Sequence, residues 1–254
     1  MAVPKKTVQN PLAKKPRTKK VVKDTHVVLV VDRSGSMGTI RSQALSGINE
    51  QFNALRTTKV KNGTTSVSVV LFDGEIDTPM LDVNSNDLVD WTDSQYVPHG
   101  STALRDATWR AIAHLKTKPV TENTAFLVVV ISDGGENAST EVSQQQLTEE
   151  IKKLEVTKQW TFTYMLANQN IQNFVRTMGV SANNVASFTS TPAGMVHASC
   201  VMSSSVAGYM QMRSVSTKNA TSNFYDSTTA PVSVDTKIDN TTTDLLAKTD
   251  SKTP

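Results

Sequence analysis

The chain has 254 residues, a net charge of +3 and 38% hydrophobic residues, which is enough for an ordinary buried core. Its longest apolar runs, residues 27–31 and 125–131, fall far short of the roughly 20 residues that cross a bilayer, so we expect no membrane association. Cys200 is the only cysteine, and the first residues lack the apolar stretch of a secretory signal. We therefore expect a cytoplasmic protein without disulfides.

Residues 1–23 form a basic arm. They contain eight Lys or Arg residues and no acid, so the rest of the chain carries a net charge of −5. Three prolines interrupt the arm and it has no apolar periodicity, which predicts disorder. Such a run can bind nucleic acid by releasing counterions, or it can act only as a solvated arm. The sequence leaves both alternatives open.

From residue 24 to residue 213, short β-rich runs alternate with stretches of helical periodicity. The predicted strands are residues 27–31, 67–72, 76–81, 126–131, 160–166 and 184–188. The predicted helices are residues 40–55, 104–115, 147–154, 171–178 and 193–213. Strands that are apolar on both faces and joined through helices are typical of a parallel sheet covered on both sides. We therefore predict one doubly wound α/β domain, with an antiparallel hairpin at one edge around Asp73 and Gly74.

The segment from residue 214 to residue 254 is polar. Sixteen of its 41 residues are Ser or Thr, so it offers too little apolar surface to offset the cost of ordering, and we predict a disordered tail. Phe224 and Tyr225 stand out in it. Two alternatives remain open: the pair anchors to the domain or to a partner, or it is a loose aromatic pair.

Two predicted strands end in a carboxylate, Asp32 and Asp133. Ligands of open α/β sheets bind beyond the carboxyl ends of the strands, so these two side chains meet at one edge if their strands are neighbours. After Asp32 the chain turns through Gly35, which points the hydroxyls of Ser34 and Ser36 in the same direction. This edge of the sheet is therefore the candidate functional site.

A third segment, HGSTALRDA, adds Thr102 at the start of a predicted helix, where it would ordinarily be interpreted as an N-terminal cap. With Asp32, Ser34, Ser36 and Asp133 it makes a set of oxygen donors without His or Cys. Hard oxygen ligands select a hard cation, and a small site that retains waters suits Mg²⁺, with Mn²⁺ a close substitute.

The segments DRSGSMG, HGSTALRDA and ISDGGEN resemble the three parts of the metal-ion-dependent adhesion site of von Willebrand factor type A domains. The resemblance covers residues 25–213, and its three motifs occur in the right order and strand context. It is closest to the small stand-alone members found in bacteria and phages, which share DRSGSM and the ANQ of residues 167–169.

The resemblance implies a role for each site residue. Ser34, Ser36 and Thr102 would bind the cation directly, and Asp32 and Asp133 would act largely through bound water. Because neutral hydroxyls leave the charge of the cation less quenched, the cation would attract a carboxylate from outside. The implied function is that of an adaptor that binds a Glu or Asp of a protein partner.

Five further residues lie close to these motifs in the sequence, and some of them have two interpretations. Arg33 either strengthens the attraction for an acidic ligand or extends into solvent. His99 is expected at the rim of the site, and Asp106 is expected to hydrogen-bond a neighbouring loop. Glu136 and Asn137 either support the site or only shape the turn after Asp133.

The sequence shows no Ser or Cys nucleophile with a matching base, so we expect no enzyme. The first alternative to the adaptor is a nucleic-acid-associated structural or virion protein that uses the arm of residues 1–23. A metal-assisted hydrolase is the other alternative.

Overall fold

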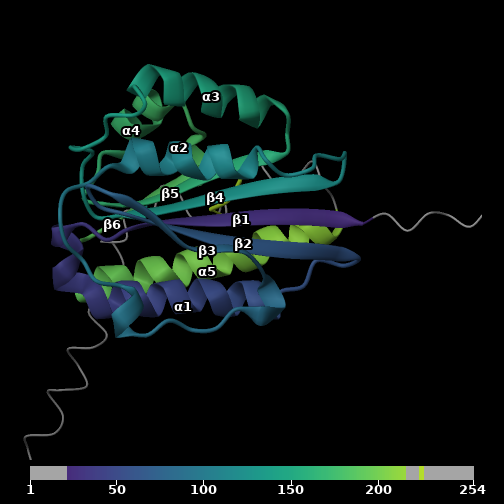
Figure 1. Ribbon diagram of the computed structural model, residues 1–254, viewed down its shortest axis with the longest axis horizontal. Helices are drawn as coiled ribbons and strands as arrows, with labels where there is room; N and C mark the ends of the chain where they lie inside the picture. Colours follow the sequence, from purple (N-terminus) through teal and green to yellow (C-terminus); the bar gives the residue numbers. More distant parts are fainter. Residues whose placement is uncertain (1–21, 216–222, 226–254) are drawn as a thin grey trace, which may run out of the picture.

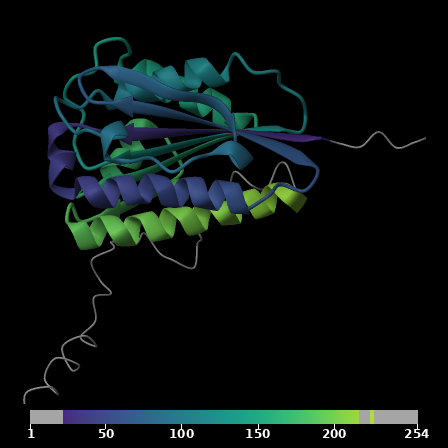
Figure 2. The same ribbon diagram turned by 60° about the horizontal axis from the view of Figure 1, so that its bottom comes forward.

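The computed structural model describes residues 22–215 and 223–225, which form a sheet between two helical layers (Figures 1 and 2). Most of the basic arm and of the polar tail lies outside the described residues. The predictions of disorder and of nucleic-acid binding made for those segments therefore stay predictions.

The sheet has six strands in the order β3-β2-β1-β4-β5-β6. The parallel strands are β1 (Lys23–Asp32), β2 (Gly63–Phe72), β4 (Thr124–Ser132), β5 (Trp160–Ala167) and β6 (Val185–Phe188). At one edge β3 (Ile76–Asn84) runs antiparallel to β2. The predicted fold class is confirmed. The strand order reverses between β1 and β4, and this is where such sheets bind ligands.

Helices cover both faces of the sheet (Figure 1). On the first face lie α1 (Arg41–Thr57) and α5 (Pro192–Val215), and on the second lie α2 (Leu104–Leu115), α3 (Gln144–Val156) and α4 (Ile171–Met178). In β1, Leu29 belongs to the core under α1 and α5, while Val28 and Val30 belong to the opposite core. This double burial explains why the strand is apolar at every position.

The start of β1 and the end of α5 are in contact with each other. Lys23 Nζ donates to the carbonyl oxygens of Arg213 and Ser214, 2.8 and 2.7 Å away, and so ties the start of β1 to the end of α5. Arg213 is fully buried and donates to the carbonyl oxygen of Asn123, at 2.7 Å. The first strand therefore begins at Lys23 and the last helix ends at Val215, next to the predicted limits of residues 24 and 213.

Phe224 and Tyr225 are buried against the domain, with 4% and 7% of their surface exposed. The Phe224 N–H donates to Asn184 Oδ1 (3.0 Å), and the Tyr225 N–H donates to the carbonyl oxygen of Asn183 (3.1 Å). Of the two alternatives for this pair, the structure shows local anchoring.

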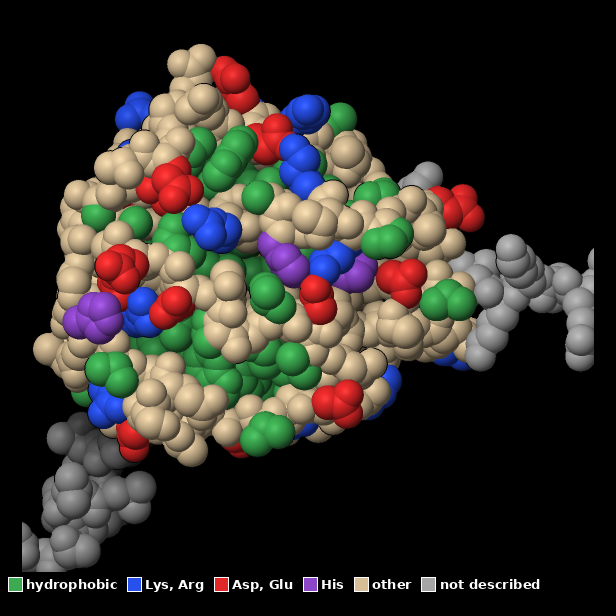
Figure 3. Space-filling view, viewed as in Figure 1, with side chains coloured by type: hydrophobic (Ala, Val, Ile, Leu, Met, Phe, Trp, Pro, Cys, Tyr) green, Lys and Arg blue, Asp and Glu red, His purple; other side chains and the backbone are tan. Residues whose placement is uncertain are grey.

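None of the described helices is both long and apolar enough to cross a membrane. Acidic and basic side chains are interspersed over the face of the molecule shown in Figure 3, without a large patch of one sign. This face of the domain therefore offers no broad electrostatic surface for a polyanion.

Glu155, in the last turn of α3, should make stability depend on pH. Burial raises the pKa of its carboxyl to about 7, with Lys158 opposing the rise. The folded state then holds a proton that the unfolded state has lost, so stability should fall as pH rises from about 4.5 to about 7 and then level off. Glu155→Gln should raise the melting temperature at pH 8 and leave it nearly unchanged at pH 4. Glu149→Gln, an exposed change on the same helix, is the control, and equal effects of both changes would contradict the prediction.

Candidate metal centre

Asp32, the last residue of β1, is fully buried at the carboxyl edge of the sheet. Its Oδ1 accepts the Ser34 N–H at 2.7 Å, and its Oδ2 accepts the Ser132 hydroxyl at 2.5 Å. Burial raises the pKa of this carboxyl, while the bonds from Ser132 and Ser34 oppose the rise. A carboxylate deprived of water in this way is stabilised by a positive charge nearby.

The two serines of the first loop meet the carboxylate that follows β4. Ser34 Oγ lies 3.1 Å from Ser36 Oγ, and Ser36 Oγ donates to Asp133 Oδ1 at 2.6 Å. The other carboxylate oxygen, Oδ2, accepts the Ser190 hydroxyl at 3.2 Å. The structure therefore brings together the residues that the sequence predicted from β1 and β4, and it adds Ser190, which the sequence did not indicate.

Thr102 completes the predicted set. Its side chain is buried and lies beside Gly134, where an added Cβ would come within 3.3 Å of Thr102 Oγ1 and 3.7 Å of Ser36 Oγ. The loop is held by backbone bonds, since the Thr102 N–H donates to Asn137 Oδ1 (2.8 Å) and its carbonyl oxygen accepts the N–H groups of Asn137 and Ala138. Any side chain larger than that of glycine at position 134 would therefore press on the Thr102 hydroxyl.

A sequence model of the von Willebrand factor type A domain matches residues 26–197, more than half of the chain. The chain belongs to this family. A comparison with curated proteins found no match.

Three solved structures share the fold of this von Willebrand factor type A domain. Proximal thread matrix protein 1 from the mussel byssus has 16% identity and a TM-score of 0.54, over 74% of this chain and 46% of that one. The vWF domain of the type V pili tip protein Mfa5 from Porphyromonas gingivalis has 12% identity and a TM-score of 0.54, over 75% and 97%. The pilus adhesin SpaC from Lactobacillus rhamnosus GG has 11% identity and a TM-score of 0.52, over 73% and 30%. This chain thus spans less than half the length of the mussel protein and of SpaC.

The interpretation of Thr102 as a helix cap is wrong. Helix α2 begins at Leu104, and the residue in the capping position is Ala103, whose side chain makes no capping bond. Instead, Glu136 from the loop after β4 accepts the N–H of Arg105 at 2.9 Å. The hydroxyl of Thr102 is therefore not used to begin the helix.

Asp73 holds the first loop of this von Willebrand factor type A domain against the third. It follows β2 and is buried, with the Arg33 Nε 2.7 Å and the His99 Nδ1 3.3 Å from its Oδ2. Its carbonyl oxygen accepts the Ala103 N–H at 2.7 Å. The sequence could have indicated Asp73, because residues 67–72 are a third apolar run that is directly followed by a carboxylate.

Neither predicted role describes Arg33. Its side chain is only 13% exposed, and its guanidinium donates to Asp73 Oδ2 and, at 3.0 Å, to Asp77 Oδ2. Arg33 therefore does not extend freely into solvent, and its charge is balanced by two carboxylates of the chain. Its role is to fix the position of the loop that carries the two serines.

Two further residues support the loops around the site. The carboxylate of Asp106 accepts the N–H groups of three consecutive residues, from Thr140 to Val142, as the sequence predicted for a loop contact. The Tyr96 hydroxyl donates to the carbonyl oxygen of Asp32 at 2.6 Å, a contact the sequence did not indicate. Its burial and the nearby Asp32 and Asp133 raise the pKa of Tyr96 well above its ordinary value, so it remains a donor at neutral pH.

The donors present fit a hard cation. Among the described residues, no three His, Cys, Asp or Glu side chains are grouped so that they could hold a metal ion, so a cation here would depend on hydroxyls. Hydroxyl and carboxylate oxygens without nitrogen or sulfur are the ligands of Mg²⁺ and Mn²⁺.

Proposed function

We propose that this domain binds a protein partner through a divalent cation, Mg²⁺ or Mn²⁺, and that it acts by binding and not by catalysis. Ser34, Ser36 and Thr102 would hold the cation, with Asp32 and Asp133 behind them. The bound cation would supply a positive charge whose coordination is completed by a Glu or Asp of the partner. Von Willebrand factor type A domains commonly mediate adhesion between proteins, which supports this proposal.

The observation that carries the proposal is the position of the hydroxyls. Ser36 and Thr102 come from loops 66 residues apart, yet both lie next to Gly134. Uncharged oxygens at this point would leave most of the charge of the cation available to a ligand from outside. Of the two carboxylates, Asp32 is fully buried and Asp133 is partly exposed.

Gly134→Ala should weaken cation binding without unfolding the domain. The added methyl would press on the Thr102 hydroxyl and touch that of Ser36, whereas the backbone at this position has no positive φ and accepts alanine. With a dissociation constant near 1 mM, about 10 mM Mg²⁺ should stabilise the wild type by about 1.4 kcal/mol. Thermal unfolding should show this as an increase of about 3–6 °C.

Gly135→Ala is the matched control, because a Cβ at position 135 meets nothing within 4 Å. It should keep the full Mg²⁺ shift, whereas Gly134→Ala and Asp133→Ala should lose most of it. Equal shifts in all variants would place the cation elsewhere. Capture of partner proteins from a native extract in Mg²⁺, but not in EDTA, then tests the function itself.

A further inference from the structure

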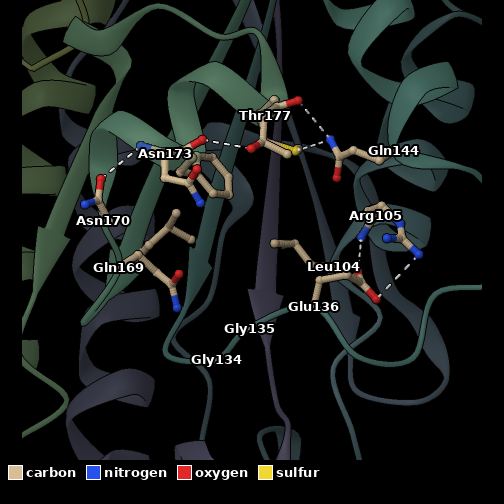
Figure 4. Close-up of a pocket in the computed structure, with 13 residues that line it drawn as sticks. Leu104, Arg105, Gly134, Gly135, Glu136, Gln144, Gln169, Asn170, Asn173 and Thr177 are labelled. Carbon is tan, nitrogen blue, oxygen red and sulfur yellow. Dashed lines mark hydrogen bonds and ion pairs between the residues drawn. The ribbon is translucent and has the colours of Figure 1, made fainter.

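A cavity of about 210 Å³ lies beside the candidate metal centre. It opens between the start of α2, the loop after β4 and helix α4, with Gly134 and Gly135 along one edge (Figure 4). Gly134 is also the residue that lies against the Thr102 and Ser36 hydroxyls. Gly134 therefore borders both the cavity and the candidate metal centre.

The floor of the cavity is apolar, and its rim carries side-chain amides. Leu104, Leu166 and Met178 line it and are at most 4% exposed, so they form the floor. Gln144 and Gln169 lie on opposite sides of the opening (Figure 4). A carboxamide has both donors and an acceptor, which match the C=O and N–H groups of a peptide backbone.

The cavity suits one uncharged side chain. The charged residues that line it, Arg105 and Glu136, face each other at 3.9 Å, and Glu136 also accepts backbone N–H groups. Although Arg105 Nε is buried without a hydrogen-bond partner, its guanidinium lies beside the Glu136 carboxylate. A charged occupant would therefore lose water and meet one charge of each sign, which gives no net attraction. The volume is below the roughly 300–1,000 Å³ of small-molecule sites, so a single side chain fits better than a cofactor.

We propose that this cavity receives a large apolar side chain of the same partner whose carboxylate completes the cation site. The inference rests on the proposed function and specifies its ligand as an extended peptide segment. Side chains two residues apart in an extended chain lie on the same side and about 6–7 Å from each other along the chain. The segment is therefore Asp or Glu, any residue, then Leu, Met or Phe, in either direction, with Gln169 bonding its backbone. Gln144 Nε2 already donates to the Thr148 hydroxyl and the Thr177 carbonyl oxygen, so Gln144 shapes the opening.

A displayed peptide library tests this ligand. The peptides carry a fixed Asp with four randomised positions on each side and are selected on the full chain in Mg²⁺ or in EDTA. Leu, Met or Phe should be enriched at least about fivefold at a position two residues from the Asp, in Mg²⁺ alone. Peptides that bind in Mg²⁺ without this preference would overturn the cavity proposal alone, whereas equal recovery in EDTA would overturn the proposed function with it.

Affinities measured for one selected peptide distinguish the contribution of the apolar floor from that of the Gln169 amide at the rim. Replacing its apolar residue with alanine should weaken binding to the wild type about tenfold, because that side chain leaves a buried position. Gln169→Ala should weaken binding about threefold through lost hydrogen bonds and keep the Mg²⁺ thermal shift. Gln145→Ala, an exposed residue of α3 outside the cavity, should change neither. Equal affinity for the peptide and its alanine counterpart would overturn the proposal.

Discussion

Thr102→Ala should abolish Mg²⁺-dependent capture of the partner and leave the domain folded. The substitution removes the hydroxyl beside Gly134, while the backbone bonds that hold the loop to Asn137 and Ala138 remain. No helix cap is lost, so the cost in stability should be about 1 kcal/mol or less. Partner capture in Mg²⁺ should fall at least about tenfold, to the level that EDTA gives. Loss of one ligand lowers the affinity of the site for the cation, and the partner binds through that cation.

Two variants make this result specific. Thr102→Ser keeps the hydroxyl and should retain both capture and the Mg²⁺ thermal shift. Thr108→Ala removes another buried threonine hydroxyl, one that donates to the Leu104 carbonyl oxygen within α2, and it should retain capture. If Thr102→Ala captures the same proteins as the wild type in Mg²⁺, the partner does not bind through this cation site and the proposal is wrong.

The fold could be predicted from the sequence because each of its strands and helices has a recognisable pattern of neighbouring residues. Each strand is a short apolar run, each helix repeats its apolar face every three to four residues, and the turn at Asp73 and Gly74 joins two adjacent strands. The same holds for the site: Asp32 ends β1, Asp133 directly follows β4, and Ser34 and Ser36 come within four residues of Asp32. Their proximity then depends only on β1 and β4 being neighbours, which the sheet confirms.

The contacts that the sequence did not predict join residues far apart in the chain. Glu136 caps α2 from 31 residues away, and Ser190 reaches Asp133 across 57 residues. Thr102 was misassigned for the same reason, since a helix start judged from neighbouring residues cannot reveal that a distant glutamate accepts the N–H. The partners of Arg33, 40 and 44 residues away, are set by the pairing of β1 with β2 and of β2 with β3.

The aromatic pair of the tail could not be assigned from sequence because its surroundings carry no periodicity. Nothing in a Ser/Thr-rich segment indicates which face of the domain two aromatic side chains meet. The structure answers this with specific contacts: the Phe224 ring lies 6.2 Å from that of Tyr209 on α5 and 5.1 Å from that of Tyr225. These contacts extend the core on the side of the sheet that α5 covers.

Phe224→Ala should therefore cost far more stability than a change in a polar tail would. Removing a buried aromatic ring costs about 3–5 kcal/mol, through lost burial and through the cavity left behind. In a domain of this size each kcal/mol lowers the melting temperature by about 2–4 °C, so the decrease should exceed about 6 °C.

The control is Met212→Ala. Met212 is an apolar residue near the end of α5 that is 44% exposed, so its replacement should shift the melting temperature much less. Thermal unfolding of the full chain measures both, and equal small shifts would show that the pair does not pack on the domain in solution. Because Phe224 lies outside the metal centre, its variant should still respond to Mg²⁺ as the wild type does, which separates anchoring of the tail from the function of the site.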